Sequence, residues 1–405
     1  MLRIVVLSDI HLGSFAAYRE FAVNDCGLEL DAEKAVSIKN DLFRILSDKK
    51  PDYIFIPGDL TTKALPSEFK KLSEILVELK EKTSSAPKII FTAGNHDTQW
   101  SISNIAEFET ATNHDKIELQ EIAAIPLLRN FKVGCKLDDE CVIPFAGFFE
   151  DDFLQIIVLN SGYYSSSGEK YHHGKIGEIQ LDWLKSQFPL NKDKWRMILM
   201  HHHPYRLKFP TLTEDITFLE EGDEVIELAA RSGIDIIIHG HRHHPIIRTK
   251  NDNTWNNPIT ILCAGSLSVN SKHRAAGTIP NTFHIIEIDE IKAVNKIFRT
   301  FNYEFAAHKG WVLSEYCDST PYDGISYYGE SIDKEDSKRQ LLVIIKKAEE
   351  SRISDIYFEL PSYEDLPLAL KCNTYDQLND LIEEIAIELG KKKTGCYPDD
   401  VIIRG

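Results

Sequence analysis

The sequence has no run of about 18 consecutive apolar residues, the length that a membrane-spanning helix requires. Its seven cysteines are odd in number and form no C-x-x-C pair. A disulfide framework and a zinc knuckle are therefore both disfavoured, and we expect reduced thiols in an intracellular protein. No cleavable signal precedes the first apolar run, so we expect a cytoplasmic protein with no membrane partner.

Basic residues are outnumbered by acidic ones. The chain has 46 Lys and Arg against 63 Asp and Glu, which gives a net charge of −17. This charge opposes general attraction to nucleic acid or anionic lipid, although a local basic patch could override it. The hydrophobic fraction of 43% is typical of a globular protein with a sizeable core.

Strand and helix patterns alternate along the chain. Apolar runs at 2–7, 52–57 and 88–93 predict strands, and periodic segments at 33–46 and 66–82 predict helices between them. Alternation of this kind indicates parallel strands with helical crossovers, an α/β fold. Further strands are predicted at 142–149, 153–160, 196–200 and 234–238, with 259–263 and 284–288 completing a second sheet.

Five of the predicted strands end in side chains that can bind metal or move a proton. They are Asp9 and His11, then Asp59, then Asn95 and His96 in the stretch Gly94-Asn95-His96-Asp97, then His201, and finally His241 and His243. Each motif alone is commoner as an ordinary turn or polar loop. Their joint placement favours a ligand site, because ligands of open α/β sheets bind at the carboxyl ends of strands.

The chemistry of these side chains points to metal. Carboxylate oxygen, amide oxygen and imidazole nitrogen suit ions such as Mn, Fe or Zn. Seven candidate ligands are too many for one catalytic ion, but they suit two divalent ions that share a bridging carboxylate. Asn95 and His96 are adjacent, so we expect them to point in different directions. With Asn95 on a metal, His96 would face the substrate, and Asp97 could accept its other N–H.

The order of these motifs resembles the calcineurin-like metallophosphoesterase superfamily. Asp9-x-His11, Gly58-Asp59, Gly94-Asn95-His96-Asp97, His201-x-x-Pro204 and Gly240-His241-x-His243 occur in the order of that family within residues 1–300. The resemblance implies a four-layer α/β/β/α sandwich with two metals. It implies hydrolysis of a phosphodiester, in a small or nucleotide-like substrate, by metal-bound hydroxide.

Residue by residue, the resemblance places Asp9, His11 and His243 at one metal. It places Asn95, His201 and His241 at the other, with Asp59 as the bridge. His96 matches the histidine that contacts the scissile phosphate and protonates the leaving oxygen, and Asp97 would orient it. His202 adjoins His201 in the same motif, so which of the two is the ligand stays open.

A finer resemblance indicates a branch of the family but does not identify the substrate. Gly58-Asp59-Leu60-Thr61, Leu159-Asn160-Ser161 and Gly177-x-x-Gln180-Leu181-x-Trp183-Leu184 are similar to the branch that contains class III cyclic nucleotide phosphodiesterases. That branch also acts on other phosphodiesters. Two alternatives are a metal-dependent nuclease of the same superfamily, which the acidic charge disfavours, and a non-catalytic binding scaffold.

The last hundred residues follow a different pattern. We predict a metallophosphoesterase domain over 1–310, a linker over 311–329 and an accessory module over 330–405. Two helices are predicted in the module, at 334–350 and 375–389. Its role is unknown, and a protein partner or self-association are both compatible with it.

Overall fold

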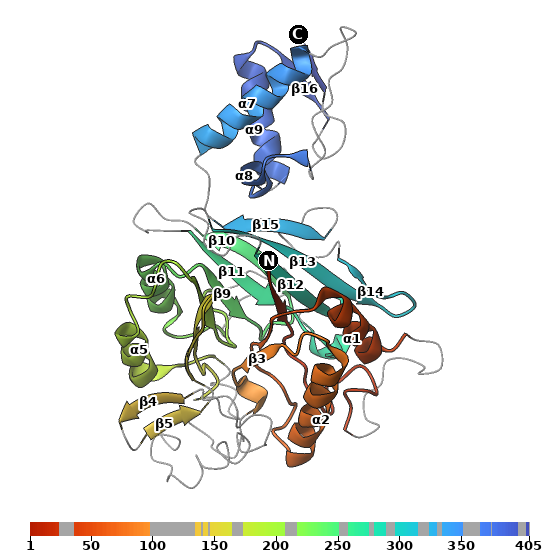
Figure 1. Ribbon diagram of the computed structural model, residues 1–405, viewed down its shortest axis with the longest axis vertical. Helices are drawn as coiled ribbons and strands as arrows, with labels where there is room; N and C mark the ends of the chain where they lie inside the picture. Colours follow the sequence, from red (N-terminus) through yellow and green to blue (C-terminus); the bar gives the residue numbers. More distant parts are fainter. Residues whose placement is uncertain are drawn as a thin grey trace.

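Figure 1 shows the computed structural model of the chain. The structure describes residues 1–23, 36–97, 134–138, 141–144, 146–163, 173–206, 217–250, 258–274, 279–288, 296–314, 324–329, 334–350, 365–373, 375–395 and 402–404. In these ranges no helix combines the length and the apolar composition needed to cross a bilayer.

Over the described residues, the first sheet has seven strands. Parallel strands β1 (Leu2–Val6), β2 (Tyr53–Ile56) and β3 (Lys88–Phe91) form one side of it. Antiparallel strands continue it beyond β1: β12 (Thr282–Ile288), β13 (Ile297–Ala306), then β14 (Gly310–Leu313) and β15 (Ile325–Gly329), which share the outer edge of β13.

In the same part of the chain, the second sheet has six strands, in the order β10, β11, β9, β8, β7, β6. They are β6 (Gly147–Glu150), β7 (Leu154–Val158), β8 (Trp195–Leu199), β9 (Ile236–His239), β10 (Pro245–Lys250) and β11 (Ile259–Ala264). The prediction that 284–288 completes this sheet is wrong, because β12 pairs antiparallel with β1 in the first sheet. An apolar run indicates a buried strand but does not reveal which strand it pairs with.

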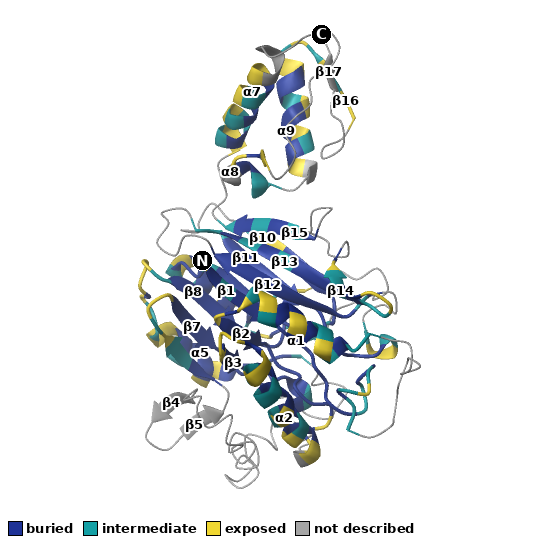
Figure 2. Ribbon diagram, turned by 45° about the vertical axis from the view of Figure 1, so that its right-hand side comes forward, coloured by how far each residue is buried: buried dark blue, intermediate teal, exposed yellow. Residues whose placement is uncertain are grey.

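Helices cover the outer faces of both sheets. Helices α1 (Ile38–Lys49) and α2 (Pro66–Lys82) pack on the first sheet, and α5 (Gly177–Ser186) and α6 (Gly222–Ser232) pack on the second. The sheets pack face to face around a core that includes Ile4, Val6 and Met197. The central strands, such as β2, β8, β9 and β12, are therefore buried on both faces, which explains their continuous apolar runs, as the burial colours of Figure 2 show. The predicted α/β/β/α sandwich is confirmed.

The described part of the C-terminal region is mainly helical. Helices α7 (Lys334–Glu350), α8 (Leu368–Lys371) and α9 (Tyr375–Glu388) are followed by short strands β16 (Lys392–Thr394) and β17 (Ile402–Arg404). The helices share a small core of their own, which includes Leu341, Leu370 and Ile382. They stand apart from the sandwich in Figures 1 and 2 and meet it at β15, where Lys371 Nζ lies 5.1 Å from the ring centroid of Tyr327.

The range predicted as a linker contains sheet structure. Within 311–329, strand β15 pairs with β13 from Ile325 to Gly329, and β14 ends at Leu313. Residues 315–323 lie outside the described part of the chain. Strand residues beyond residue 310, namely 311–313 of β14 and Ile325–Gly329 of β15, therefore belong to the first sheet, and the division into domains stays a prediction.

Candidate metal centre

The carboxyl ends of β1, β2, β3, β8 and β9 meet at one edge of the sandwich. Polar side chains of the loops that follow these strands turn toward one another, and the backbone bends sharply to allow it. Asp9, His11, Asp59, His241 and His243 all have positive φ angles between 47° and 77°. Non-glycine residues rarely adopt this left-handed conformation, and such strain concentrates at functional sites.

The first cluster consists of Asp9, His11, Asp59 and His243. His243 Nε2 lies 3.1 Å from His11 Nε2 and 3.2 Å from Asp9 Oδ1. His11 Nε2 lies 3.2 Å from Asp59 Oδ2. All four side chains are buried. This many nitrogen and oxygen atoms directed at one buried point is the donor set that a divalent cation requires.

The second cluster consists of Asn95, His201 and His241, together with Asp59. Asn95 Oδ1 lies 3.1 Å from His201 Nε2 and 3.0 Å from His241 Nδ1. His201 Nε2 also lies 3.3 Å from Asp59 Oδ2. The amide oxygen and the carboxylate thus approach the same imidazole nitrogen. All seven candidate ligands from the sequence are brought together in these two clusters.

Asp59 belongs to both clusters through a single oxygen atom. Its Oδ2 approaches His11 on one side and His201 on the other, while Oδ1 accepts a hydrogen bond of 2.9 Å from the His96 backbone N–H. Burial alone would raise the pKa of Asp59, but the nearby imidazoles of His201, His96 and His11 hold it well below its ordinary value. The shared carboxylate is therefore ionised.

The imidazoles differ in how readily they accept a proton. Burial lowers the pKa of His11 to about 4. Burial also lowers the pKa of His201, but the Asp59 carboxylate outweighs this and raises it to about 9. A cation that binds His201 must displace that proton, so metal affinity should fall as the pH falls.

Backbone carbonyl groups orient two of these imidazoles from behind. His201 Nδ1 lies 2.8 Å from the carbonyl oxygen of Pro57, and His243 Nδ1 lies 2.6 Å from that of His273. Ligand histidines usually donate their second ring N–H in this way, which fixes the ring and the nitrogen that faces the metal.

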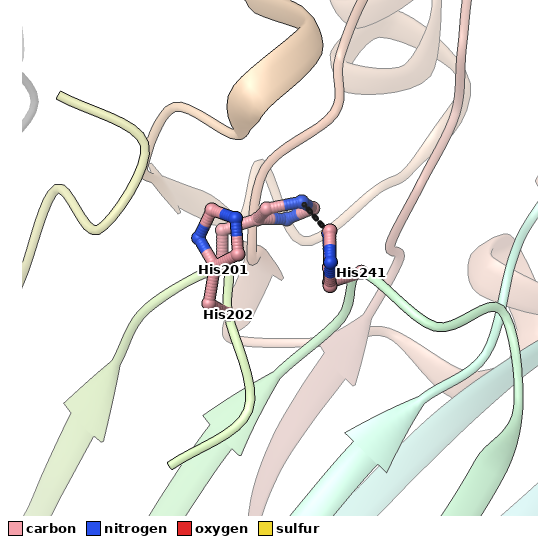
Figure 3. Close-up of side chains that lie close together, drawn as sticks. All are labelled: His201, His202 and His241. Atoms are coloured by element: carbon pink, nitrogen blue, oxygen red, sulfur yellow. Dashed lines mark hydrogen bonds between the residues drawn. The ribbon is translucent and has the colours of Figure 1, made fainter. Parts of the chain in front are cut away.

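His202 lies behind the second cluster. Its Nδ1 is 2.9 Å from Ser161 Oγ, and its ring is 4.3 Å from that of His241. Figure 3 shows the rings of His201, His202 and His241 gathered at neighbouring strand ends, and nitrogens of all three lie within 4.8 Å of one another. Only His201 joins both Asp59 and Asn95, which favours His201 as the ligand of this motif.

His96 lies beside the clusters with its ring partly exposed. Its Nδ1 is 3.0 Å from the carbonyl oxygen of Thr62, and its ring packs 4.7 Å from that of His11. His96 is not among the candidate ligands of either cluster, and its place on the substrate side stays a prediction. Thr62 could not be predicted as a partner of His96, because a backbone carbonyl acceptor leaves no pattern in the side chains.

The expected role of Asp97 must be corrected. Asp97 does not orient the His96 ring, because its oxygens accept hydrogen bonds from the backbone N–H groups of Leu60, Thr61 and Gly94 and from the Thr61 hydroxyl. Burial and the neighbouring Asp59 raise the pKa of Asp97 to about 7. Asp97 is a positioning residue that ties the loop after β3 to the loop after β2.

Two glycines permit the close approach of these loops. A Cβ atom on Gly94 would lie 2.2 Å from Asp59 Oδ1, and one on Gly240 would lie 2.3 Å from Asp9 Oδ2. Neither position can accept a side chain without moving a carboxylate of the clusters.

A family model described as calcineurin-like phosphoesterase matches residues 2–245, which is more than half of the 405 residues. The chain belongs to the calcineurin-like phosphoesterase family. The matched range contains all seven candidate ligands, His96 and Asp97.

Individual relatives of this calcineurin-like phosphoesterase are more distant. A probable cyclic nucleotide phosphodiesterase from Rhodococcus erythropolis is 23% identical over 207 residues, which are 51% of this chain and 56% of that protein. A cAMP/cGMP dual specificity phosphodiesterase from Mycobacterium tuberculosis is 26% identical over 200 residues, 49% of this chain and 50% of that protein. The chain thus spans about half the length of these curated relatives.

Among solved structures, PhoD aligns with a TM-score of 0.51 and 8% identity, over 81% of this chain and 70% of PhoD. At this identity the likeness supports the fold alone.

Proposed function

We propose that this calcineurin-like phosphoesterase hydrolyses phosphodiester bonds of a small, nucleotide-like substrate with the help of two divalent metal ions. One observation carries the proposal: Asp59 Oδ2 stands 3.2 Å from His11 Nε2 and 3.3 Å from His201 Nε2, and so joins two buried donor clusters. The cyclic nucleotide activity named for the two relatives supports the choice of a diester.

The two clusters would hold one ion each, with Mn, Fe or Zn suited to the donor set. Asp9, His11 and His243 would hold the first ion, Asn95, His201 and His241 the second, and Asp59 would contact both. When bound, such ions polarise the phosphoryl oxygens and lower the pKa of a water molecule. The burial of the carboxylates keeps bulk water from screening these interactions.

His96 would supply the proton for the leaving oxygen. With Nδ1 directed at the Thr62 carbonyl, Nε2 is the nitrogen through which a partly exposed imidazole can reach a substrate. The His96 backbone N–H donates to Asp59, so the acid is held at a fixed position relative to the carboxylate shared by the clusters. General acid catalysis of this kind typically contributes about 10²- to 10⁴-fold.

A substrate screen tests the proposal. Purified protein loaded with Mn²⁺ would be assayed with bis(p-nitrophenyl) phosphate, p-nitrophenyl phosphate, 3′,5′-cyclic AMP and short single-stranded DNA. We expect turnover of the diesters that is lost on chelation, with the monoester slower. Faster cleavage of DNA than of any small diester would favour a nuclease instead. No turnover by protein that holds two metals per chain would favour a binding scaffold.

A further inference from the structure

Two aromatic rings lie at the edge of the first cluster without joining it. The half-buried ring of Phe15 stacks on the exposed imidazole of His273, with ring centroids 3.8 Å apart and ring planes 15° from parallel. The residues come from segments far apart in the sequence. We call Phe15 and His273 the aromatic pair.

The aromatic pair is held in place by the backbone. The segments that carry it run antiparallel, with a β-bridge between Ala16 and Val269 and a hydrogen bond of 2.9 Å from Asn270 N–H to the Phe15 carbonyl. The Asn270 side chain caps the short 3₁₀ helix η2 (Ser271–His273), and Arg274 Nε donates to the Val269 carbonyl at 2.8 Å. These backbone contacts therefore fix the positions of the two segments that carry the stacked rings.

The aromatic pair lies next to the reacting groups. The Phe15 ring is 5.4 Å from the His96 ring and 5.7 Å from the His11 ring. The backbone carbonyl of His273 is the group that orients His243. A substrate whose phosphate lay between the clusters and His96 would thus have the rest of its structure within reach of these rings.

We propose that the aromatic pair binds the base of a nucleotide-like substrate, with the base stacked on the face of His273 that is turned away from Phe15. This inference rests on the proposed function and specifies the substrate as a phosphodiester that carries a nucleobase. Every base presents a π-face, and base–aromatic stacking tolerates different bases. Phe15 would hold the imidazole flat, and the pair would discriminate against purely alkyl phosphodiesters.

Binding measurements on the Mn²⁺-loaded protein separate the contribution of the base to affinity from that of the phosphate. Isothermal titration calorimetry would compare adenosine 5′-monophosphate with ribose 5-phosphate, in which a hydroxyl group takes the place of the base. We expect the wild-type protein to prefer the adenosine compound by roughly tenfold or more, and His273→Ala and Phe15→Ala to lose most of that preference. Ribose 5-phosphate should bind all variants alike, and His273→Trp should keep the preference.

The matched control is His308→Ala, which removes another exposed histidine, in the turn between β13 and β14. It should leave both affinities unchanged. Equal wild-type affinities for the two compounds would overturn the inference. So would an equal loss of both in His273→Ala, which would mean that the variant had disturbed His243 instead. A preserved base preference in a protein that cleaves no diester would contradict the proposed function but leave the stacking intact.

Discussion

Asp59 is the residue on which both clusters depend, because its Oδ2 atom faces His11 in one cluster and His201 in the other. Asp59→Ala should therefore remove a ligand from two ions at once. We expect elemental analysis to find less than half of the wild-type metal content per chain. Turnover should fall by more than the roughly 10- to 100-fold that follows loss of an outer-shell partner.

Asp182→Ala provides the control for Asp59, since that carboxylate is 77% exposed on α5 and lies outside the clusters. It should retain wild-type metal content and activity. Two metals per chain in Asp59→Ala would contradict the shared role of this carboxylate.

His96 should behave differently from a ligand. His96→Ala should keep both metals and the fold but slow an alkyl phosphodiester by about 10²- to 10⁴-fold, because a poor leaving oxygen needs the proton. A p-nitrophenyl ester, whose phenolate leaves without protonation, should lose much less. Equal losses with both substrates would indicate that His96 positions the phosphate and does not donate a proton.

At the scale of elements, Asp97 joins the loop after β2 to the loop after β3. Asp97→Ala would leave the N–H groups of Leu60, Thr61 and Gly94 without their acceptor. An unsatisfied buried donor costs about 1–3 kcal/mol, so we expect a loss of roughly 3 kcal/mol or more in the free energy of unfolding. Urea titration would measure it. Asp97→Asn, which keeps one acceptor oxygen, should lose less stability. An unchanged urea midpoint in Asp97→Ala would contradict the role of Asp97 in joining the two loops.

A buried histidine on strand β12 should make the stability of the fold depend on pH. His284 is fully buried there, and burial lowers its pKa, although the side-chain amide oxygen of Asn302 and the backbone carbonyl oxygen of Ala264, which face its ring nitrogens, oppose this effect. The unfolded chain, with a histidine pKa of about 6.5, then binds a proton more readily than the folded one. Stability is therefore complete above about pH 6.5 and declines as the pH falls toward the folded pKa.

Comparison of the wild type with His284→Gln isolates this contribution. Both proteins would be measured without metal between pH 7.5 and 5.5. Over this range the free energy of unfolding of the wild type should fall more steeply than that of His284→Gln, by up to about 1.4 kcal/mol per pH unit. The slope is the informative quantity, because the substitution can also lower stability at every pH. Parallel curves would show that His284 takes up its proton equally well in both states.

The strand ends also show what the sequence could and could not predict. The carboxyl ends of parallel strands meet at one edge, so Asp9, Asp59 and His241 could be expected to lie together from their positions after apolar runs. The partner of β12 and the true partners of Asp97 could not be predicted, because they depend on pairing between distant segments. His273 was also missed, since its contribution to the site is a backbone carbonyl and a ring placed by a loop.

At the scale of the whole molecule, strand β15 lies between the sandwich and the C-terminal helices. Strand β15 occupies part of the outer edge of β13, and its Tyr328 is buried between the sheets, 5.7 Å from the ring of Phe298. Helices α7, α8 and α9 instead share their own core, and Tyr327 is the residue of β15 that packs against it. From these contacts we propose a boundary after Gly329.

Two truncated chains test this boundary. A chain that ends at Gly329 should fold with near wild-type melting temperature and keep its activity on a generic phosphodiester, because every described strand of both sheets is retained. A chain that ends at Tyr322 lacks β15, leaves the edge of β13 unpaired and removes Tyr328 from the core. Loss of a large buried aromatic side chain alone costs about 3–5 kcal/mol, so this chain should melt far lower or fail to fold. If both chains fail, the helical module stabilises the sandwich through Tyr327, and if both are equally stable, β15 contributes little to the sheet.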